Sequence, residues 1–331
     1  MTHDDMAGAR VLVTGAAGFI GMHASRALHD AGAEVVGVDN FEPYYDVALK
    51  EARVAVLGGL PRFAFRRVDL ADAAATAALF RDGGFSHVVH LAAQPGVRYS
   101  LVNPAAYVRN NIDAFGHILE GCRHAAIAHL VYASSSSVYG ANHTLPFSED
   151  QPTDTPVSLY AATKKANELM AYSYSHLFGR PATGLRFFTV YGPWGRPDMS
   201  PMLFAKAILA GEPIAVFNHG RMRRDFTYVD DVVEGIVRVL ARPPGAHDGA
   251  PHAVYNIGNH EAVELETFIA TLERLLGRKA IRDYREMQAG DVPVTYAAID
   301  RLAAATGFAP HTALADGLAR FVLWYRDYYR E

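Results

Sequence analysis

The sequence of 331 residues contains a single cysteine, Cys122, and has no apolar run that approaches the roughly 18 residues of a membrane span. One cysteine excludes an intramolecular disulfide and a cysteine-rich metal site, and it fits a reducing compartment. The 15 histidines show no paired metal-ligand spacing with carboxylates. The acidic start lacks a charged-then-apolar signal design. We therefore expect a cytoplasmic protein with no metal and no membrane association.

Neither sign of charge dominates, because 31 Lys and Arg oppose 35 Asp and Glu, for a net charge of -4. This balance provides no global field for nucleic acid or an anionic membrane. The local basic cluster of Arg221, Arg223 and Arg224 fits a diphosphate better than nucleic acid, so no nucleic-acid partner is expected. With 50% hydrophobic residues, the chain can bury the core of one large domain or two closely joined domains.

Short apolar runs alternate with alanine-rich helical segments over the first 180 residues. The expected strands are 10–14, 34–38, a run that ends at 68–69, 87–91 and 130–133, and the expected helices include 19–29, 71–80 and 105–124. This alternation predicts an α/β protein with a doubly wound parallel sheet. The alternation of strands and helices is less regular after about residue 180, where segments 192–197 and 242–251 are rich in turn-forming residues.

A glycine-rich loop follows the first expected strand. Gly15, Gly18 and Gly21 have the spacing G-x-x-G-x-x-G between that strand and the helix that contains Phe19 and Ile20. Such a loop turns tightly, lets the backbone approach a pyrophosphate, and directs the phosphates to a helix N-terminus. In this context the motif predicts a dinucleotide cofactor.

Asp39 ends the second expected strand, 18 positions after Gly21. A carboxylate there accepts hydrogen bonds from ribose hydroxyls and repels a 2′-phosphate, which favours NAD over NADP. The nearest arginine that could counter this preference is Arg53, which we expect far along the following loop. Asp69 ends the next strand, where it either meets the adenine edge or caps the helix before Ala71.

Tyr160 and Lys164 are four residues apart, so on a helix they share one face. An ammonium beneath a phenol favours the phenolate, which is a base suited to removing a hydroxyl proton. The spacing alone occurs by chance in many helices. The upstream glycine loop and the serine run Ser134 to Ser137 make a catalytic role the better explanation.

The glycine loop, the segment 134–140 and the Tyr160-x-x-x-Lys164 motif together resemble the extended short-chain dehydrogenase/reductase family over essentially the whole length. Segments 94–100, 187–199 and 223–231 are similar to those of UDP-glucuronate 4-epimerases within that family. The resemblance implies a Rossmann-type domain with tightly bound NAD over residues 1–185. It also implies a UDP-sugar-binding lobe mainly over 186–331, interleaved with elements that complete the first domain, and a homodimer.

The resemblance also assigns roles to single residues. Ser135, 25 residues before Tyr160, matches the catalytic serine or threonine, and Ser136 is near enough to share its role. The expected cofactor-binding residues are Gly15, Gly18, Phe19, Ile20, Gly21, Asp39, Asn40, Asp69, Leu70, Leu91, Ala92, Ala93, Asn110, Tyr160 and Lys164. The expected substrate-binding residues are Gln94, Arg98, Ser137, Thr189, Arg196, Phe217, Arg224 and Asp291. Gln288 stands where the family often has a phosphate-binding arginine.

These residues imply interconversion of UDP-glucuronate and UDP-galacturonate through a transient 4-keto sugar, because carbon 4 bears no acidic hydrogen. Such a ketone is a β-keto acid that loses carbon dioxide readily, and we expect Thr189 and Arg196 to restrain its carboxylate. A neutral-hexose 4-epimerase, a UDP-glucuronate decarboxylase and a non-catalytic NAD-binding sensor remain alternatives. A dehydratase is disfavoured because Ser136 and Ser137 stand where its acidic pair would be.

Overall fold

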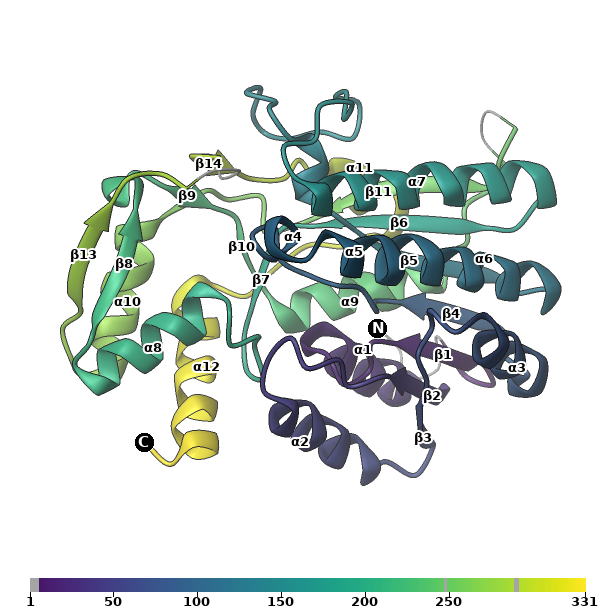
Figure 1. Cartoon of the computed structure of the whole chain (residues 1–331), viewed down its shortest axis with the longest axis horizontal. Coiled ribbons are helices and arrows are strands. Elements are labelled where there is room, and N and C mark those ends of the chain that lie inside the picture. The colour runs from purple at the N-terminus through teal and green to yellow at the C-terminus, as the bar shows by residue number, and fades with distance from the viewer. Residues whose placement is uncertain (1–5, 247–248, 289–291) are drawn as a thin grey trace.

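The computed structural model describes residues 6–246, 249–288 and 292–331, and Figure 1 shows a large sheet flanked by helices beside a smaller lobe. The strands are β1 (Arg10–Thr14), β2 (Glu34–Asp39), β3 (Phe63–Arg67), β4 (His87–His90), β5 (His129–Ser135), β6 (Ala182–Phe187), β7 (Thr189–Tyr191), β8 (Pro213–Phe217), β9 (Arg223–Arg224), β10 (Phe226–Tyr228), β11 (His252–Ile257), β12 (Val263–Glu264), β13 (Ile281–Arg285) and β14 (Val294–Thr295). The helices are α1 (Phe19–Asp30), α2 (Val47–Gly58), α3 (Ala73–Gly83), α4 (Tyr99–Val102), α5 (Pro104–Tyr107), α6 (Ala114–His124), α7 (Leu159–Phe178), α8 (Ser200–Ala210), α9 (Val229–Leu240), α10 (Leu265–Leu276), α11 (Asp300–Thr306) and α12 (Leu314–Tyr329).

The described residues form a large sheet with strand order β11-β6-β5-β4-β1-β2-β3, in which every neighbouring pair is parallel. The chain runs outward from β1 to β3 and then crosses back to β4, on the other side of β1. This reversal of strand order creates a crevice at the carboxyl ends of β1 and β4, where open α/β sheets bind ligands. The predicted Rossmann-type doubly wound fold is confirmed.

Both faces of the large sheet are buried at its central strands, whereas the edge strand β3 is partly exposed. Val11 and Val13 of β1 belong to one core cluster with side chains of α1 and α9, whereas Leu12 belongs to a second cluster with side chains of α3 and α6. Successive side chains of a strand point to opposite faces, so a strand covered on both sides needs a continuous apolar run. The apolar strands therefore form a rigid base for the loops at their carboxyl ends.

The structure differs from the expected elements in the helix predicted over 105–124. That segment consists of α5, a π-helical segment η1 (Val108–Asp113) and α6. Within η1, Asn111 Oδ1 accepts a hydrogen bond from the Gln94 backbone N–H at 2.7 Å, and Asn111 Nδ2 donates to Thr163 Oγ1 at 3.1 Å. The side-chain amide of Asn111 thus joins the π-helical segment to α7 and to the segment after β4.

The helix after β3 begins later than expected. Its N-cap is Asp72, whose Oδ1 accepts from the Ala75 N–H at 3.0 Å. Asp69 Oδ1 accepts instead from the Ala71 N–H at 3.0 Å, in the turn before the helix. The interpretation of Asp69 as the cap of this helix is therefore wrong.

The smaller lobe contains α8, α10 and the parallel pair β8 and β13, at the left of Figure 1. Residues after 185 also return to the large sheet, where β11 pairs with β6, and α9 packs against α1. The division of the chain at residue 185 into cofactor-binding and substrate-binding parts stays a prediction. Among the described residues, no helix combines the length and apolar character needed to cross a membrane.

Candidate active site

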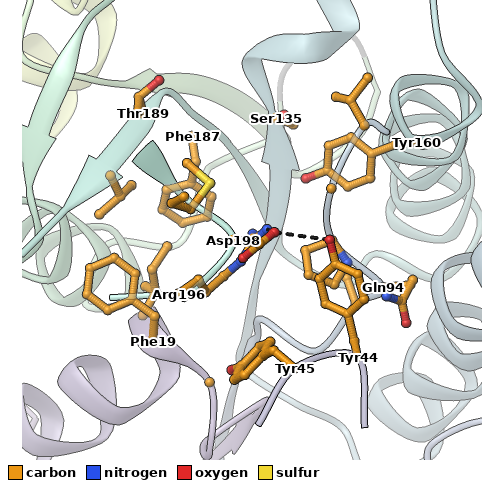
Figure 2. Close-up of a pocket in the computed structure, with 18 of the residues that line it drawn as sticks. Phe19, Tyr44, Tyr45, Gln94, Ser135, Tyr160, Phe187, Thr189, Arg196 and Asp198 are labelled. Atoms are coloured by element: carbon orange, nitrogen blue, oxygen red, sulfur yellow. Dashed lines mark hydrogen bonds and ion pairs between the residues drawn. The ribbon is translucent and has the colours of Figure 1, made fainter. Parts of the chain in front are cut away.

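A cavity of about 1020 Å³ lies at the carboxyl ends of the large sheet and extends to the smaller lobe. Its wall includes every residue that the sequence predicts to be catalytic or to bind cofactor or substrate, apart from Asp291, which lies outside the described residues. Figure 2 shows Ser135, Tyr160, Thr189 and Arg196 around this cavity. Their placement is as expected, while their roles stay predictions.

The glycines of the loop have no side chains that would keep a ligand away from its backbone. Gly15 has φ +71°, and a Cβ there would lie 2.8 Å from the Ala92 nitrogen. A Cβ on Gly21 would lie 2.0 Å from the Gly15 oxygen. Gly18 is the N-cap of α1 and provides no side-chain hydrogen bond, so the first N–H groups of α1 remain for an anionic ligand. The loop from Gly15 to Gly21 and the N-terminus of α1 thus form a glycine cradle that fits the pyrophosphate of a dinucleotide.

The segment Leu91 to Ala93 lies beside the glycine loop because Thr14 holds it there. The backbone N–H groups of Leu91 and Ala92 donate to Thr14 Oγ1 at 3.2 and 3.1 Å. His90 Nδ1 lies 2.8 Å from the same hydroxyl, and burial together with the charge of Lys164 lowers the pKa of His90 to about 3. A neutral histidine therefore helps to join the ends of β1 and β4.

Asp39 lines the cavity, and its Oδ1 accepts from the Phe41 N–H at 2.8 Å. The expectation that Arg53 lies far along a loop is wrong, because Arg53 is fully buried on α2. Its guanidinium donates to the carbonyls of Ala17, Trp194 and Gly195 and to the Tyr45 hydroxyl. These bonds occupy Arg53, so the expected preference for NAD over NADP depends on Asp39.

Tyr160 lies in the first turn of α7, where the Ser158 hydroxyl caps the helix by accepting from the Ala161 N–H at 3.1 Å. The ring of Tyr107 meets the Tyr160 ring edge-on, with 6.2 Å between centroids. Ser135 ends β5 across the cavity, and its hydroxyl donates to Ser137 Oγ at 3.1 Å. The end of β5 and the start of α7 thus bring the predicted serine hydroxyls close to Tyr160, the predicted base.

The electrostatic surroundings of Tyr160 include a cation other than Lys164. Burial raises the pKa of Tyr160, whereas a hydrogen bond with Ser135 and the charge of Arg196 act in the opposite direction. Burial lowers the pKa of Lys164 to about 8, and its Nζ donates to the Ala133 carbonyl at 2.8 Å. Arg196 is therefore a cation near Tyr160 that the sequence did not predict, whereas the support expected from Lys164 and the cofactor stays a prediction.

Arg196 belongs to the loop after β7, and a carboxylate fixes its side chain. Its Nε and Nη2 donate to the two oxygens of Asp198 at 3.0 and 2.5 Å. The Tyr44 hydroxyl donates to Asp198 Oδ2 at 3.0 Å (Figure 2). Sequence reasoning missed both partners. Asp198 stands within the family-like segment 187–199, but Tyr44 has no stronger signal than its place shortly after Asp39.

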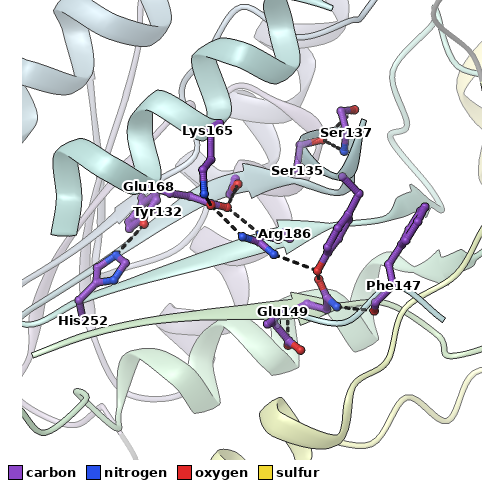
Figure 3. A network of polar contacts seen from close by, with 12 residues as sticks. Tyr132, Ser135, Ser137, Phe147, Glu149, Lys165, Glu168, Arg186 and His252 are labelled. Carbon is purple, nitrogen blue, oxygen red and sulfur yellow. Dashed lines mark hydrogen bonds and ion pairs between the residues drawn. The ribbon is translucent and has the colours of Figure 1, made fainter. Parts of the chain in front are cut away.

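A buried ionic network lies behind the serine run (Figure 3). Glu168 is two helical turns beyond Tyr160 on α7 and accepts from Ser134 Oγ at 2.7 Å. Arg186 of β6 donates to both carboxylate oxygens of Glu168, at 2.8 and 2.9 Å. The network joins α7 to β5 and β6, so it sets the position of the helix that carries Tyr160.

The expected nucleotide-binding side chains come from two places: Gln94 and Arg98 from the segment after β4, and Phe217 and Arg224 from the ends of β8 and β9. Arg98 lies over the Phe217 ring, with 5.3 Å between guanidinium carbon and ring centroid. Arg224 Nη1 donates to the Pro293 carbonyl at 3.1 Å. Gln94 is buried, and its Nε2 finds no acceptor among the described groups of the protein. An unpaired buried amide at a cavity wall suits a ligand with hydrogen-bond acceptors.

A sequence model of the NAD dependent epimerase/dehydratase family matches residues 11–258. The chain belongs to this family. Across the parts that the structure describes, no group of three or more His, Cys, Asp or Glu side chains is arranged to hold a metal ion.

Relatives within the family are similar over nearly the whole chain. A probable UDP-glucuronate 4-epimerase of Rhizobium meliloti is 48% identical, covering 97% of this chain and 98% of its own length. UDP-glucuronate 4-epimerase 2 of Arabidopsis thaliana is 47% identical, covering 98% of this chain and 77% of its own length. The solved UDP-glucuronic acid 4-epimerase of Bacillus cereus, in complex with UDP-glucuronic acid and NAD, is 35% identical with a TM-score of 0.88, covering 97% and 100% of the two chains. The resemblance predicted from the motifs is confirmed.

Proposed function

We propose that the protein is an NAD-dependent isomerase that interconverts UDP-glucuronate and UDP-galacturonate by inverting carbon 4. The observation that carries this proposal is the arrangement of Tyr160, Ser135 and Arg196 around one cavity that also contains the glycine cradle. The names of the Rhizobium, Arabidopsis and Bacillus relatives support it.

The cradle and its neighbours suit NAD. The N–H groups at the start of α1 would meet the pyrophosphate, Asp39 the adenosine ribose, and Lys164 the nicotinamide ribose. Bound there, NAD supplies the reversible removal of hydride from carbon 4 and its return to the opposite face of the sugar. The protein supplies the proton transfer and the geometry.

Tyr160 is the base for the 4-hydroxyl proton. Its phenolate removes that proton beside Ser135 and gives it back after inversion. The charge of Arg196 favours the phenolate, and we expect Lys164, one turn further along α7, to favour it as well. Both transfers need the hydroxyl within hydrogen-bond reach, and β5 and α7 fix the two protein groups relative to each other.

Arg196 and Thr189 hold the sugar carboxylate in this proposal. Carbon dioxide leaves a 4-keto uronate most easily when the breaking bond is parallel to the carbonyl π system, so the carboxylate must be kept out of that alignment. Arg196 carries a permanent charge on the cavity wall, and Thr189 begins the strand that leads to its loop. Arg196→Ala should raise the fraction of carbon dioxide and UDP-pentose formed per turnover. Weaker binding with unchanged product ratios contradicts this role.

The nucleotide must be gripped more firmly than the sugar, because the ketone has to present both of its faces in turn. Phe217, Arg98 and Arg224 offer an aromatic face and two cations for the uridine and the diphosphate. Asp291 is expected to meet the uridine ribose. The sugar then turns between these anchors and the Arg196 loop.

The direct test is incubation of the purified protein with UDP-glucuronate, with NMR identification of the products. The proposal predicts UDP-galacturonate. Exclusive UDP-pentose would indicate a decarboxylase, and preferential turnover of UDP-glucose would indicate a neutral-hexose epimerase. Absence of turnover of both UDP-glucuronate and UDP-glucose, with NAD bound, would favour a sensor protein.

A homodimer in the cytoplasm completes the proposal. Leu169, Tyr172 and Leu177 are exposed on one side of α7, two of them by 60% and 66%, and such apolar surface suits a second copy of the chain. The single buried Cys122 is compatible with a reducing compartment. Light scattering should give twice the chain mass, and Leu169→Lys with Leu177→Lys should give the monomer. Cell fractionation tests the location.

A further inference from the structure

Hydrogen bonds that involve Asp198 and Tyr44 fix the side chain of Arg196, and this arrangement affects which substrate the cavity prefers. The inference rests on the function proposed above. We propose that Asp198 and Tyr44 are a positioning pair that presents one edge of Arg196 to the substrate carboxylate and thereby sets the preference for a uronate over a neutral hexose.

A guanidinium can bind a carboxylate through two bonds at either of two edges, Nε with Nη2 or Nη1 with Nη2. Asp198 occupies the first edge, with bonds from Nε and Nη2 at 3.0 and 2.5 Å. Within the described part of the chain, Nη1 bonds to no protein group. Arg196 lines the cavity, so its second edge remains for a carboxylate on the ligand.

Tyr44 fixes Asp198 in turn. Its hydroxyl donates to Asp198 Oδ2 at 3.0 Å, so the carboxylate receives three hydrogen bonds and has one orientation that satisfies all of them. The Tyr44 ring packs on Tyr99, with 4.8 Å between centroids. The hydroxyl therefore projects from a supported ring, and the direction of Arg196 is set through Asp198.

The backbone of this loop has a separate anchor. Arg53 donates to the Trp194 carbonyl from Nε and Nη2 at 3.2 and 2.7 Å, and to the Gly195 carbonyl at 3.2 Å. The Trp194 ring also packs on Trp324, with 5.3 Å between centroids. Because these contacts place the backbone, loss of the Tyr44 hydroxyl should change the direction of the Arg196 side chain and leave the loop in place.

Charge favours the same role. The side chains of Arg196 and Asp198 are 22% and 29% exposed, so each is partly withdrawn from water. Burial lowers the pKa of Arg196, and the charge and hydrogen bond of Asp198 outweigh this and raise it. A guanidinium is charged at neutral pH in any case, and Asp198 stabilises this partly buried charge at the cavity wall, where a neutral hexose offers no charge to pair with it.

A competing role for Asp198 predicts the opposite result. If Asp198 merely occupied Arg196 in competition with the substrate, removing its charge would free the guanidinium and strengthen UDP-glucuronate binding. If Asp198 positions Arg196, removing its charge weakens UDP-glucuronate binding and leaves UDP-glucose binding nearly unchanged. The sign of the change therefore decides between the two roles.

The experiment measures dissociation constants of UDP-glucuronate and UDP-glucose by calorimetry with NAD-loaded protein in a Tyr160→Phe background, which stops turnover. Tyr44→Phe should weaken UDP-glucuronate binding roughly fivefold and Asp198→Asn roughly tenfold or more, with UDP-glucose within about twofold. Tyr99→Phe is the matched control, because it removes a hydroxyl from the neighbouring ring that bonds to Asn103 and not to Asp198. It should change neither constant.

The second measurement uses the same variants with Tyr160 intact. Loss of orientation should raise the fraction of UDP-pentose formed from UDP-glucuronate, because the carboxylate is no longer held in one direction. Equal weakening of both nucleotides, tighter UDP-glucuronate binding by Asp198→Asn, or no change in either variant overturns the proposal. If the unaltered protein binds UDP-glucuronate without converting it, the proposed function fails while the dissociation constants still decide the role of the pair.

Discussion

The Ser134 hydroxyl donates to Glu168 Oε1 at 2.7 Å, which joins the end of β5 to the second turn of α7 beyond Tyr160. Ser135 is the next residue of the strand, and Tyr160 lies on the same helix as Glu168. The proposed proton-transfer groups are therefore held in register by a buried carboxylate that touches neither of them. Arg186 completes this arrangement by donating to both oxygens of Glu168.

Glu168→Gln should lower the free energy of unfolding by about 3 kcal/mol, because it leaves the buried Arg186 without an anionic partner. Urea unfolding at neutral pH measures this change. Glu120→Gln is a suitable control, since Glu120 is paired with Arg123 at the surface and should cost less than about 1 kcal/mol. Equal costs for the two variants would contradict the assigned role of Glu168.

The contribution of Glu168 should also depend on pH. Burial raises the pKa of Glu168, but the hydrogen bond and charge of Arg186 outweigh burial and hold the pKa below its ordinary value. A carboxyl whose pKa is lower in the folded state stabilises the fold above its unfolded pKa, about 4.3, and loses that contribution as the pH falls through the folded pKa. The stability difference between wild type and Glu168→Gln should therefore be constant near neutrality and shrink below about pH 4. A difference that grows on acidification would contradict this sign.

Arg196→Met should move the acidic limb of the pH–rate profile to higher pH. The charge of Arg196 lowers the pKa of Tyr160 against the effect of burial, so its loss raises that pKa and reduces the phenolate at neutral pH. The profile of kcat against pH measures the shift. Arg285→Met, at an exposed position of β13, serves as control and should leave the limb in place. An unshifted limb in Arg196→Met would exclude Arg196 as a cation that supports the base.

Asp39→Asn should narrow the preference for NAD over NADP by roughly tenfold, because it removes the charge that repels a 2′-phosphate. It should not reverse the preference, since Arg53 is buried and bonded to carbonyls and supplies no partner for that phosphate. Titration of cofactor-stripped protein with both dinucleotides measures the ratio. Glu51→Gln, an exposed change on α2, is the control. A ratio unaffected by Asp39→Asn would contradict the assignment.

Much of the site follows from local sequence patterns. The glycine loop, the carboxylate of Asp39 and the pair Tyr160 and Lys164 each depend on spacing within one strand, turn or helix, and all of them line the cavity as expected. Local periodicity specifies such features because neighbouring residues on one element share a direction. The parallel sheet was also predictable from local patterns, because short apolar runs alternate with helical segments along the chain.

Contacts between distant segments could not be predicted in this way. The bond between Tyr44 and Asp198 spans 154 positions, and those from Arg53 to Trp194 span 141. They depend on how the loop after β2 and helix α2 meet the loop after β7, which no local pattern encodes. Asn111 is a similar case, because its buried bonds to Gln94 and Thr163 accompany a π-helical segment in a stretch whose composition predicts an ordinary helix.

The central claim is inversion through a transient ketone with hydride retained by the protein. It is tested most directly by incubating the purified protein with UDP-glucuronate in deuterium oxide, with no added cofactor, and examining carbon 4 of the product by NMR. The account predicts UDP-galacturonate that carries protium at carbon 4, because the hydrogen removed from that carbon is returned without exchange with solvent. UDP-galacturonate that carries deuterium at carbon 4 would contradict it.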